Sequence, residues 1–267
     1  MLTTLTLHTD EQVALVTLNR PLQRNAIDER MIADLHELVE GLGKDPDLRA
    51  VVLTGAGKAF CSGMDLGYVA RTATAPEEEI RRDTERLRDL FLAIRRCRLP
   101  WIAAVNGPAM AGGAGLATAC DIIVADRVHG RFGYPEAMIG FIPALVAVLL
   151  QARVGETASR DLLLSGRAVK ADAALRMGLI NELAEEGQVV ALAGQRARAL
   201  ARSCSPGSIA STKALLEEIR GKSAEDAMAA AVEANLVRRA SAECHRGVQA
   251  FLDKEELDWR RLGATDA

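Results

Sequence analysis

The sequence is poor in aromatic residues, in cysteine and in net charge. Only 3% of its 267 residues are Phe, Trp or Tyr, so we expect a core of aliphatic side chains and alanine. The five cysteines are scattered and odd in number, which argues against a disulfide framework and against a zinc site. A net charge of −3 gives no general attraction to nucleic acid or to an anionic membrane. These shortages favour a globular protein of a reducing compartment, the cytoplasm, without nucleic acid as a partner.

Segments that target or cross a membrane are also missing from the pattern. The N-terminal stretch has neither a basic start nor a long apolar run, so we expect no signal peptide. The longest apolar run covers residues 142–150 and is far too short to cross a bilayer. The sequence therefore predicts no membrane partner.

Short apolar runs alternate with helical patterns through the first two thirds of the chain. The pattern predicts strands at residues 2–8, 12–18, 49–54, 101–105 and 122–125. It predicts helices at 28–41, capped by Asp28, and at 77–98, with a short one at 113–119. A loop is expected at 131–143, and helices follow from about 144, with at most one short strand near 179–183. Strands joined by helical crossovers predict an α/β fold with a largely parallel sheet.

Several catalytic and binding signatures are incomplete or missing. The run Gly113-Ala-Gly-Leu-Ala-Thr118 lacks the third glycine of a dinucleotide fingerprint, and the stretch 54–58 lacks the spacing of a phosphate loop. The four histidines show no metal-ligand spacing, and no Gly-x-Ser-x-Gly elbow occurs. Cys61 lies in a glycine-containing loop without a nearby basic activator, so a packing role is favoured over a nucleophile.

Two glycine-containing turns and one glutamate remain as candidates for chemistry. The loop 58–66 follows one apolar strand, and the turn 111–113 follows another and opens the short helix. Each turn exposes backbone N–H groups, and a helix start favours negative charge, so together the turns could hold one oxyanion. Glu136 lies among proline and apolar residues, where a carboxylate costs free energy unless it is paired or functional.

An ordered series of motifs along nearly the whole chain resembles the crotonase superfamily, also called the enoyl-CoA hydratase/isomerase family. The motifs are Leu18-Asn-Arg-Pro, Arg24-Asn-Ala, Ala59-Phe-Cys-Ser-Gly-Met-Asp-Leu, Ala103-Ala-Val-Asn-Gly-Pro-Ala, Ala119-Cys-Asp-Ile-Ile-Val-Ala, Phe132-Gly-Tyr-Pro-Glu, Leu164-Ser-Gly-Arg, Ala174-Leu-Arg-Met-Gly-Leu-Ile-Asn and Ala250-Phe-Leu-Asp-Lys. The resemblance implies a crotonase-like spiral of ββα units with a helical C-terminal trimerisation region. It places the α/β core with the acyl-CoA site at residues 1–190 and the oligomerisation region at 191–267.

The resemblance also implies a substrate and a set of site residues. The substrate is an acyl-CoA thioester, and coenzyme A is part of that substrate, so no separate cofactor and no metal are expected. The N–H groups of Met64 and Gly112 would form the oxyanion hole, and Glu136 would be the catalytic acid and base. Coenzyme contacts fall on Arg24, Cys61, Ser62, Asp65, Leu66 and Lys254, the last reaching coenzyme A from a neighbouring subunit of a homotrimer or homohexamer.

One departure from the family pattern bears on the reaction. Hydratases of this family usually carry a first glutamate on the short helix, and here that position is Gly115. A single carboxylate suits a proton shuttle between C2 and C4, which favours a Δ3,Δ2-enoyl-CoA isomerase. The segment 132–143 is more similar to hydratases that act on branched or unusual enoyl thioesters, in which Glu136 would relay the proton of water, with Tyr134 helping. We expect reversible hydration of a 2-enoyl-CoA, with the isomerase and a non-catalytic acyl-CoA-binding protein as alternatives.

Overall fold

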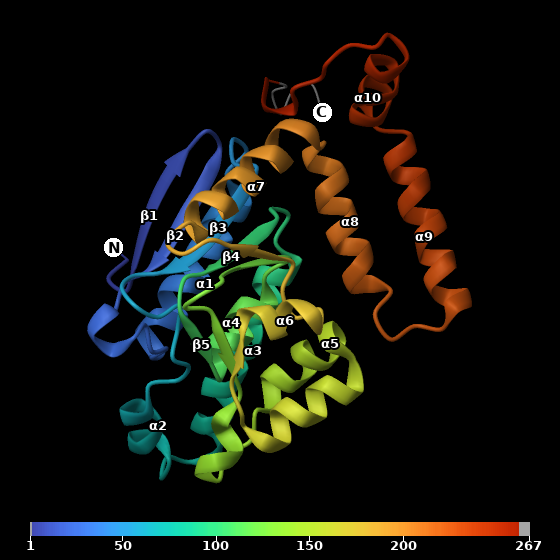
Figure 1. Ribbon diagram of the computed structural model, residues 1–267. Coiled ribbons are helices and arrows are strands. Elements are labelled where there is room, and N and C mark those ends of the chain that lie inside the picture. The colour runs from blue at the N-terminus through green and yellow to red at the C-terminus, as the bar shows by residue number, and fades with distance from the viewer. Residues whose placement is uncertain (1, 262–267) are drawn as a thin grey trace.

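The computed structural model describes residues 2–261 and is built around a six-stranded sheet (Figure 1). The strands lie in the order β1-β2-β3-β4-β6-β9, and every neighbouring pair except β1–β2 is parallel. Their bounds are β1 (Leu5–Asp10), β2 (Val13–Leu18), β3 (Ala50–Gly55), β4 (Trp101–Val105), β6 (Ile122–Asp126) and β9 (Glu182–Ala184). The predicted α/β fold with a largely parallel sheet is therefore confirmed.

A smaller sheet of three strands stands beside the main one. It consists of β5 (Pro108–Met110), β7 (Arg131–Gly133) and β8 (Val169–Lys170), in that order. Strands β5 and β7 are parallel, so the segments that leave them begin at the same end of this sheet. That end carries the candidate active site described below.

Helices cover both faces of the main sheet, because alternate side chains of each strand point to opposite sides. On β3, Val51 and Leu53 join the larger core, which also contains side chains of α1 (Glu29–Lys44), α3 (Glu77–Arg96), α4 (Gly112–Ala119) and α5 (Ala144–Ser165). Its neighbours Ala50 and Val52 join a second core under α7 (Val189–Ser203). Strand β3 is buried on both faces, and its continuous apolar run reflects this.

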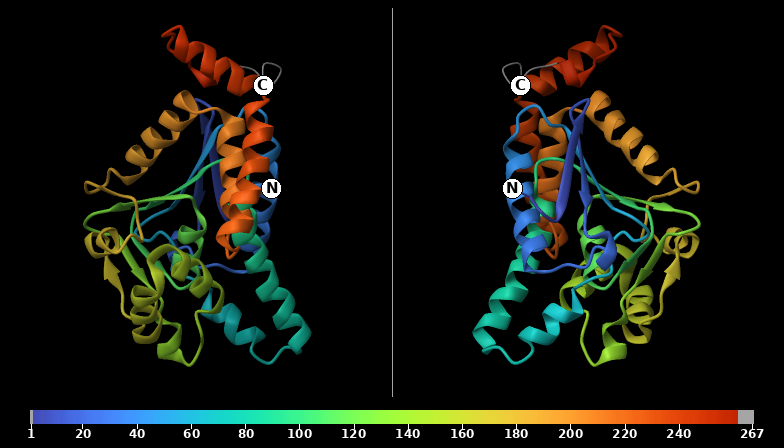
Figure 2. Two further views of the ribbon diagram at one scale, coloured as in Figure 1. Left: turned by 90° about the vertical axis from the view of Figure 1, so that its right-hand side faces the viewer. Right: turned by 90° about the vertical axis from the view of Figure 1, so that its left-hand side faces the viewer.

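Two short α-helices, α2 (Leu66–Thr72) and α6 (Ala171–Arg176), lie in connections between strands. The three C-terminal α-helices are α8 (Pro206–Glu218), α9 (Ala224–Arg239) and α10 (Ala242–Leu252). Figure 1 shows that α9 and α10 stand away from the sheet, and Figures 1 and 2 show α10 at the opposite end of the molecule from α2. We call α8, α9 and α10 the C-terminal arm. Within residues 2–261, no helix has both the length and the apolar character needed to span a membrane.

Lys213 of α8 fastens the C-terminal arm to the core. Its buried Nζ donates to the carboxylate of Asp121 at 2.6 Å and to the carbonyl of Leu99 at 2.7 Å. Arg95 of α3 forms a second ion pair with Glu217. The arm therefore projects from a fixed base on α8.

The structure corrects several boundaries expected from the sequence. The chain after residue 144 contains two short strands, β8 and β9, instead of at most one near 179–183. The segment 131–143, expected as a loop, contains β7 and a 3-10 helix, Pro135–Ile139. The strand expected near 179–183 corresponds to β9, whereas β5, β7 and β8 were missed because two or three residues are too few for an alternating pattern to be visible.

The predicted division at residues 190 and 191 falls inside α7. This helix packs on β2, β3, β4 and β6, so it belongs structurally to the sheet rather than to the arm. Residues 1 and 262–267, at the ends of the two predicted regions, lie outside the described residues.

Candidate active site

The loop that follows β3 is held in place by a buried side chain. The amide nitrogen of Asn25 donates to the carbonyl oxygens of Ala56, Ala59 and Phe60 at 2.9 to 3.2 Å. Its carbonyl oxygen accepts from the backbone of Arg20. The sequence analysis quoted Asn25 within a motif but gave it no role, because a hydrogen-bonding partner 31 to 35 residues away leaves no local pattern.

Two glycines let this loop lie directly against the turn that precedes α4. The carbonyl of Cys61 accepts from the backbone of Met110 at 2.9 Å. A Cβ added to Gly113 would lie 2.3 Å from that same carbonyl oxygen. A Cβ added to Gly63, whose φ is +93°, would lie 2.8 Å from the Cβ of Ala111. Only glycine permits this approach, so the loop 61–64 and the turn 110–113 form one rigid unit.

This rigid unit presents two free backbone donors. The N–H groups of Met64 and Gly112 make no hydrogen bond to any residue of the described part of the chain. A Cβ on Gly112 would lie 3.8 Å from the backbone nitrogen of Met64, so the two donors are neighbours. Gly112 is the first residue of α4, where a helix favours negative charge. The arrangement suits an oxygen that gains charge during a reaction.

Ala111, which precedes the Gly112 donor, has a strained backbone conformation. Its φ is +50° and its ψ is −126°, a conformation that residues with a side chain rarely adopt. The hydrogen bond from the Ala111 backbone to the carbonyl of Gly133, at 2.8 Å, holds the residue there. Strain of this kind occurs where the surrounding structure fixes it, often at functional sites.

The parallel pairing of β5 with β7 brings Glu136 to the same place. Met110 at the end of β5 is paired with Gly133 at the end of β7. The chain then enters α4 from one strand and the 3-10 helix containing Glu136 from the other. This register, rather than closeness in sequence, makes α4 and the 3-10 helix that contains Glu136 begin at the same end of the small sheet.

Glu136 is buried and one of its oxygens is unpaired. The residue is 8% exposed, and Oε2 has no hydrogen-bond partner among the described residues. Burial raises the pKa of the Glu136 carboxyl, and a hydrogen bond from its own backbone N–H opposes part of that rise. A carboxyl with a raised pKa and a free oxygen is suited to take up and release a proton during a reaction.

The hydroxyl of Tyr134 is also buried without a partner in the described chain. Burial raises the pKa of this phenol, and the charge of nearby Glu136 contributes to the rise. Tyr134 is therefore a neutral hydroxyl close to the glutamate.

Position 115 offers no room for a second carboxylate in the present packing. A Cβ added to Gly115 would lie 2.4 Å from Cγ1 of Val146 and 2.9 Å from Cζ of Phe91. The sequence indicated that the side chain of a glutamate is absent, but it gave no sign of what fills the space. The structure shows that two apolar side chains fill it.

The predicted coenzyme-contact residues fall into two groups. Arg24 and Ser62 are neighbours, because the Ser62 backbone donates to the Arg24 carbonyl at 3.0 Å, and the Arg24 side chain is exposed. Leu66 is exposed as well. Lys254 is exposed in the turn that follows α10, and α10 lies at the far end of the C-terminal arm (Figure 1). Within one chain, Lys254 is therefore not part of the site around Glu136.

Cys61 and Asp65 have structural tasks in this fold. Cys61 is fully buried, and burial raises the pKa of its thiol to about 12, so the packing role expected from the sequence is confirmed. The Asp65 carboxylate accepts from the Tyr68 backbone at the start of α2 and pairs with Arg20 at 3.2 Å. These two bonds lower the pKa of Asp65, the Tyr68 bond most of all.

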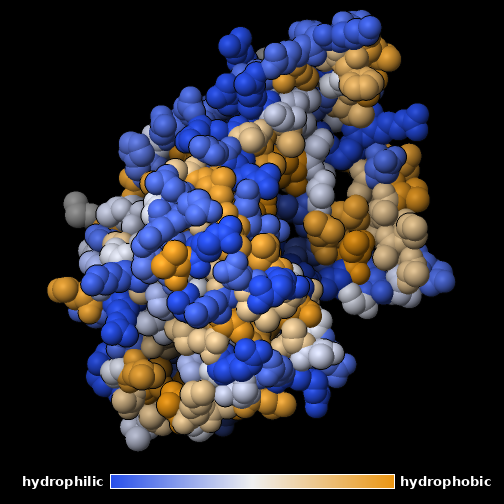
Figure 3. Space-filling view, in the orientation of Figure 1, coloured by the Kyte–Doolittle hydropathy of each residue, from blue (hydrophilic) through white to orange (hydrophobic). Residues whose placement is uncertain are grey.

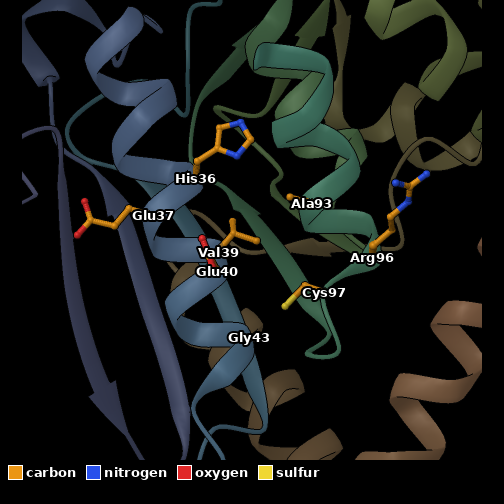
Figure 4. A pocket seen from close by; sticks show the side chains of 8 residues that line it. All are labelled: His36, Glu37, Val39, Glu40, Gly43, Ala93, Arg96 and Cys97. Atoms are coloured by element: carbon orange, nitrogen blue, oxygen red, sulfur yellow. The ribbon is translucent and has the colours of Figure 1, made fainter. Parts of the chain in front are cut away.

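A separate groove of about 440 Å³ lies between α1 and α3 (Figure 4). Charged and polar side chains such as His36, Glu40 and Arg96 line it, and Cys97 lies at its floor near Gly43. It contains neither a residue of the rigid unit nor Glu136. The groove is therefore distinct from the candidate active site.

Comparisons with a family model, with known sequences and with solved structures all indicate the same family. The family model described as Enoyl-CoA hydratase/isomerase matches residues 8–261. A protein of Thermus thermophilus named "Putative enoyl-CoA hydratase" is 43% identical over 242 residues, which are 91% of this chain and 95% of that protein. The 2,3-dehydroadipyl-CoA hydratase of Escherichia coli is 30% identical over 94% of this chain and 96% of its own length. The solved structure of an enoyl-CoA hydratase from Mycobacterium smegmatis has a TM-score of 0.89 and 33% identity, and the match covers 96% of this chain and 99% of that one.

Proposed function

Because this chain belongs to the enoyl-CoA hydratase/isomerase family, whose crotonase-like fold it shares, we propose that it reversibly hydrates a 2-enoyl-CoA thioester. One observation carries the proposal: the neighbouring N–H groups of Met64 and Gly112 are unpartnered at the end of β5, and a buried glutamate with an unpartnered oxygen follows the paired strand β7. Several relatives are also named as hydratases.

The reaction follows from these three groups. The thioester oxygen accepts hydrogen bonds from the N–H groups of Met64 and Gly112. These bonds stabilise the enolate more than they stabilise the bound substrate. Glu136 takes a proton from water as the water oxygen bonds to C3, and the π electrons of the double bond move into the enolate. Glu136 then returns a proton to C2. Each donor is expected to lower the barrier by about 3–4 kcal/mol.

Isomerisation of a 3-enoyl-CoA is the second candidate. It needs one carboxyl to move a proton between C2 and C4, with no water. The apolar side chains beside Gly115 favour this alternative, since they leave Glu136 as the one carboxylate assigned to the reaction. We rank hydration first because the more similar relatives carry hydratase names.

Product analysis separates the two reactions. The protein is incubated with a 2-enoyl-CoA and, separately, with a 3-enoyl-CoA, and the products are identified by mass spectrometry and NMR. We expect a 3-hydroxyacyl-CoA from the 2-enoyl substrate. A migrated double bond without any water adduct would reject hydration and establish the isomerase.

A protein that binds acyl-CoA without turnover is the remaining alternative, and Glu136→Gln tests it. The amide keeps the shape of the side chain but cannot act as a base. We expect turnover to fall by at least about 100-fold, as for loss of a general base, while affinity for a saturated acyl-CoA stays unchanged. Wild-type protein that binds acyl-CoA yet turns over neither enoyl substrate would establish the binding protein instead.

The coenzyme moiety is proposed to lie along the loop 61–66 beside Arg24. The exposed guanidinium of Arg24 is available for a phosphate group, and exposed Leu66 can flank an adenine ring. Ser62, in the same loop as Leu66, lies beside Arg24, because its backbone N–H donates to the Arg24 carbonyl. Cys61 and Asp65 contribute by fixing the loop. No cofactor besides the coenzyme A of the substrate is proposed.

We also propose that the protein is a homotrimer or homohexamer, with Lys254 reaching coenzyme A in a neighbouring subunit. The C-terminal arm supports this, because α9 exposes Met228, Val232 and Leu236 at four-residue spacing on one face. Figure 3 shows apolar side chains gathered on the arm. Light scattering tests the assembly, and Leu236→Lys is expected to dissociate it. A monomeric wild type would refute it.

The cytoplasm is the proposed compartment. All five cysteines are free, and three of them are buried, so this fold uses no disulfide. A reducing environment suits such a set of thiols.

A further inference from the structure

The space beside Gly115 borders the place where the substrate reacts. Gly115 follows Gly112 by three residues, so the two lie on the same face of α4, one turn apart. The Cα–Cβ direction of a helical residue leans toward the helix N-terminus. A side chain at 115 would therefore lean toward the oxyanion turn, where the thioester carbonyl is held and from which C2 and C3 extend.

Phe91 and Val146 close this space from two different helices. Val146 comes from the first turn of α5 and Phe91 from α3, and each is 3% exposed. Their nearest atoms to a Cβ at 115 are Cγ1 of Val146 at 2.4 Å and Cζ of Phe91 at 2.9 Å. All of these atoms are hydrocarbon. We call this pair of side chains the apolar wall.

A surface groove lies between the same two helices, α3 and α5. It has a volume of about 400 Å³ and is lined by Ile80, Thr84 and Arg88 of α3 and by Leu145 of α5, among others. Phe91 continues the α3 face of Thr84 and Arg88, and Val146 follows Leu145 directly. The groove and the apolar wall are therefore formed by neighbouring residues of α3 and α5.

We propose that Phe91 and Val146 determine substrate specificity, by limiting the size of the acyl group beside the reacting carbons. This inference rests on the proposed acyl-CoA site. It names the substrate class as enoyl thioesters without a branch at C2 or C3 on the side that faces Gly115. Water and polar substituents are disfavoured there too, because the wall offers no hydrogen-bond partner.

The apolar wall can exclude a branched acyl group because the packing around it is tight. The wall atoms already contact the backbone of a fully buried helix, so an added methyl group on the substrate has no free volume to enter. Val146→Ala removes two methyl groups from the wall, and Phe91→Leu replaces the phenyl ring with a smaller side chain. Either change opens space beside Gly115.

The test compares but-2-enoyl-CoA with 2-methylbut-2-enoyl-CoA and 3-methylbut-2-enoyl-CoA. In Val146→Ala and Phe91→Leu we expect the ratio of kcat/KM, branched over unbranched, to rise about 10- to 100-fold, the range for one methyl group in a pocket. Val39→Ala is the matched control, because Val39 has the same type of side chain and is 4% exposed in the same core, on α1. The control should leave the ratio unchanged. An unchanged ratio in both wall variants overturns the proposal.

Binding measurements keep this test independent of the reaction. Calorimetry with butanoyl-CoA and 2-methylbutanoyl-CoA should show the same shift in relative affinity in the wall variants. If the wild type turns over no enoyl-CoA, the proposed function fails while this measurement still decides the role of the wall. Equal relative affinities in wild type and both variants would refute the wall.

A double substitution checks the geometry itself. Gly115→Ala places a methyl group against Val146, and Val146→Ala removes the atoms that it meets. We expect the double variant to have a higher Tm than Gly115→Ala alone. Additive losses of Tm would show that Val146 does not fill the space beside Gly115, and would overturn the proposal.

Discussion

Gly63 and Ala111 touch so closely that a Cβ on Gly63 would lie 2.8 Å from the Cβ of Ala111. The two residues come from loops that follow different strands, and the contact fixes how far apart Met64 and Gly112 lie. Both residues have positive φ, +93° for Gly63 and +50° for Ala111. The spacing of the proposed oxyanion donors therefore depends on one glycine without a functional group.

Gly63→Ala is expected to damage both stability and activity. The added methyl group overpacks the contact with Ala111, which costs about 1–3 kcal/mol, and a side chain at positive φ costs a further 1–2 kcal/mol or so. Urea unfolding measures the loss, and turnover of a 2-enoyl-CoA measures the displaced donors. Gly41→Ala is the control, because a Cβ there meets nothing within 4 Å and the residue lies inside α1. Equal effects of the two substitutions would contradict the close approach.

Removal of one donor N–H should slow the reaction without weakening coenzyme binding. Gly112→Pro deletes the N–H at the first position of α4, where proline suits the helix. We expect kcat to fall by about 100- to 1,000-fold. Gly112→Ala keeps the N–H, and its Cβ makes only ordinary contacts at 3.8 Å, so most activity should remain. Full activity in well-folded Gly112→Pro, or in Met64→Pro, would rule out the proposed oxyanion hole.

Glu136→Gln should stabilise the fold at neutral pH. Burial raises the pKa of Glu136 above its ordinary 4.5 in the folded protein. A raised folded pKa means that wild-type stability is full below the unfolded pKa and falls as pH rises through the folded pKa. The glutamine variant has no such loss. Its Tm advantage over wild type should appear as pH rises above about 4.5, level off above the folded pKa and shrink in acid. Calorimetry across this range measures it, and a pH-independent difference would argue against a buried, titrating carboxyl.

Lys213→Met should loosen the C-terminal arm. The substitution removes the ammonium that contacts Asp121 and the Leu99 carbonyl, and the Asp121 carboxylate keeps only a neutral donor, the Trp101 backbone N–H at 2.7 Å, in place of that ion pair. Breaking a buried pair on one side costs about 3–5 kcal/mol, and the partly exposed Asp121 favours the lower end. Lys222→Met, in an exposed i,i+4 pair, should cost only about 0.3–0.5 kcal/mol. Similar urea midpoints for the two variants would show that Lys213 does not secure α8.

Local patterns in the sequence determined much of the architecture. The alternation of buried strands with amphipathic helices predicted the α/β class, and Asp28 caps α1 as expected, since its side chain accepts from the Met31 backbone. The apolar residues next to Glu136 in the sequence also indicated a carboxylate short of polar partners, and its Oε2 has none among the described residues. These features depend on residues within a few positions of each other, and such residues interact whatever the rest of the chain does.

Only the tertiary structure decided how the site is closed. Asn25 binds carbonyls more than 30 residues away, and strands β8 and β9 exist because long-range partners pair with their few residues. The sequence shows that position 115 is glycine, whereas the fold decides that Phe91 and Val146, 24 and 31 residues away along the chain, fill the space beside it. Such contacts are set by the packing of whole helices against one another, and no pattern within one helix records them.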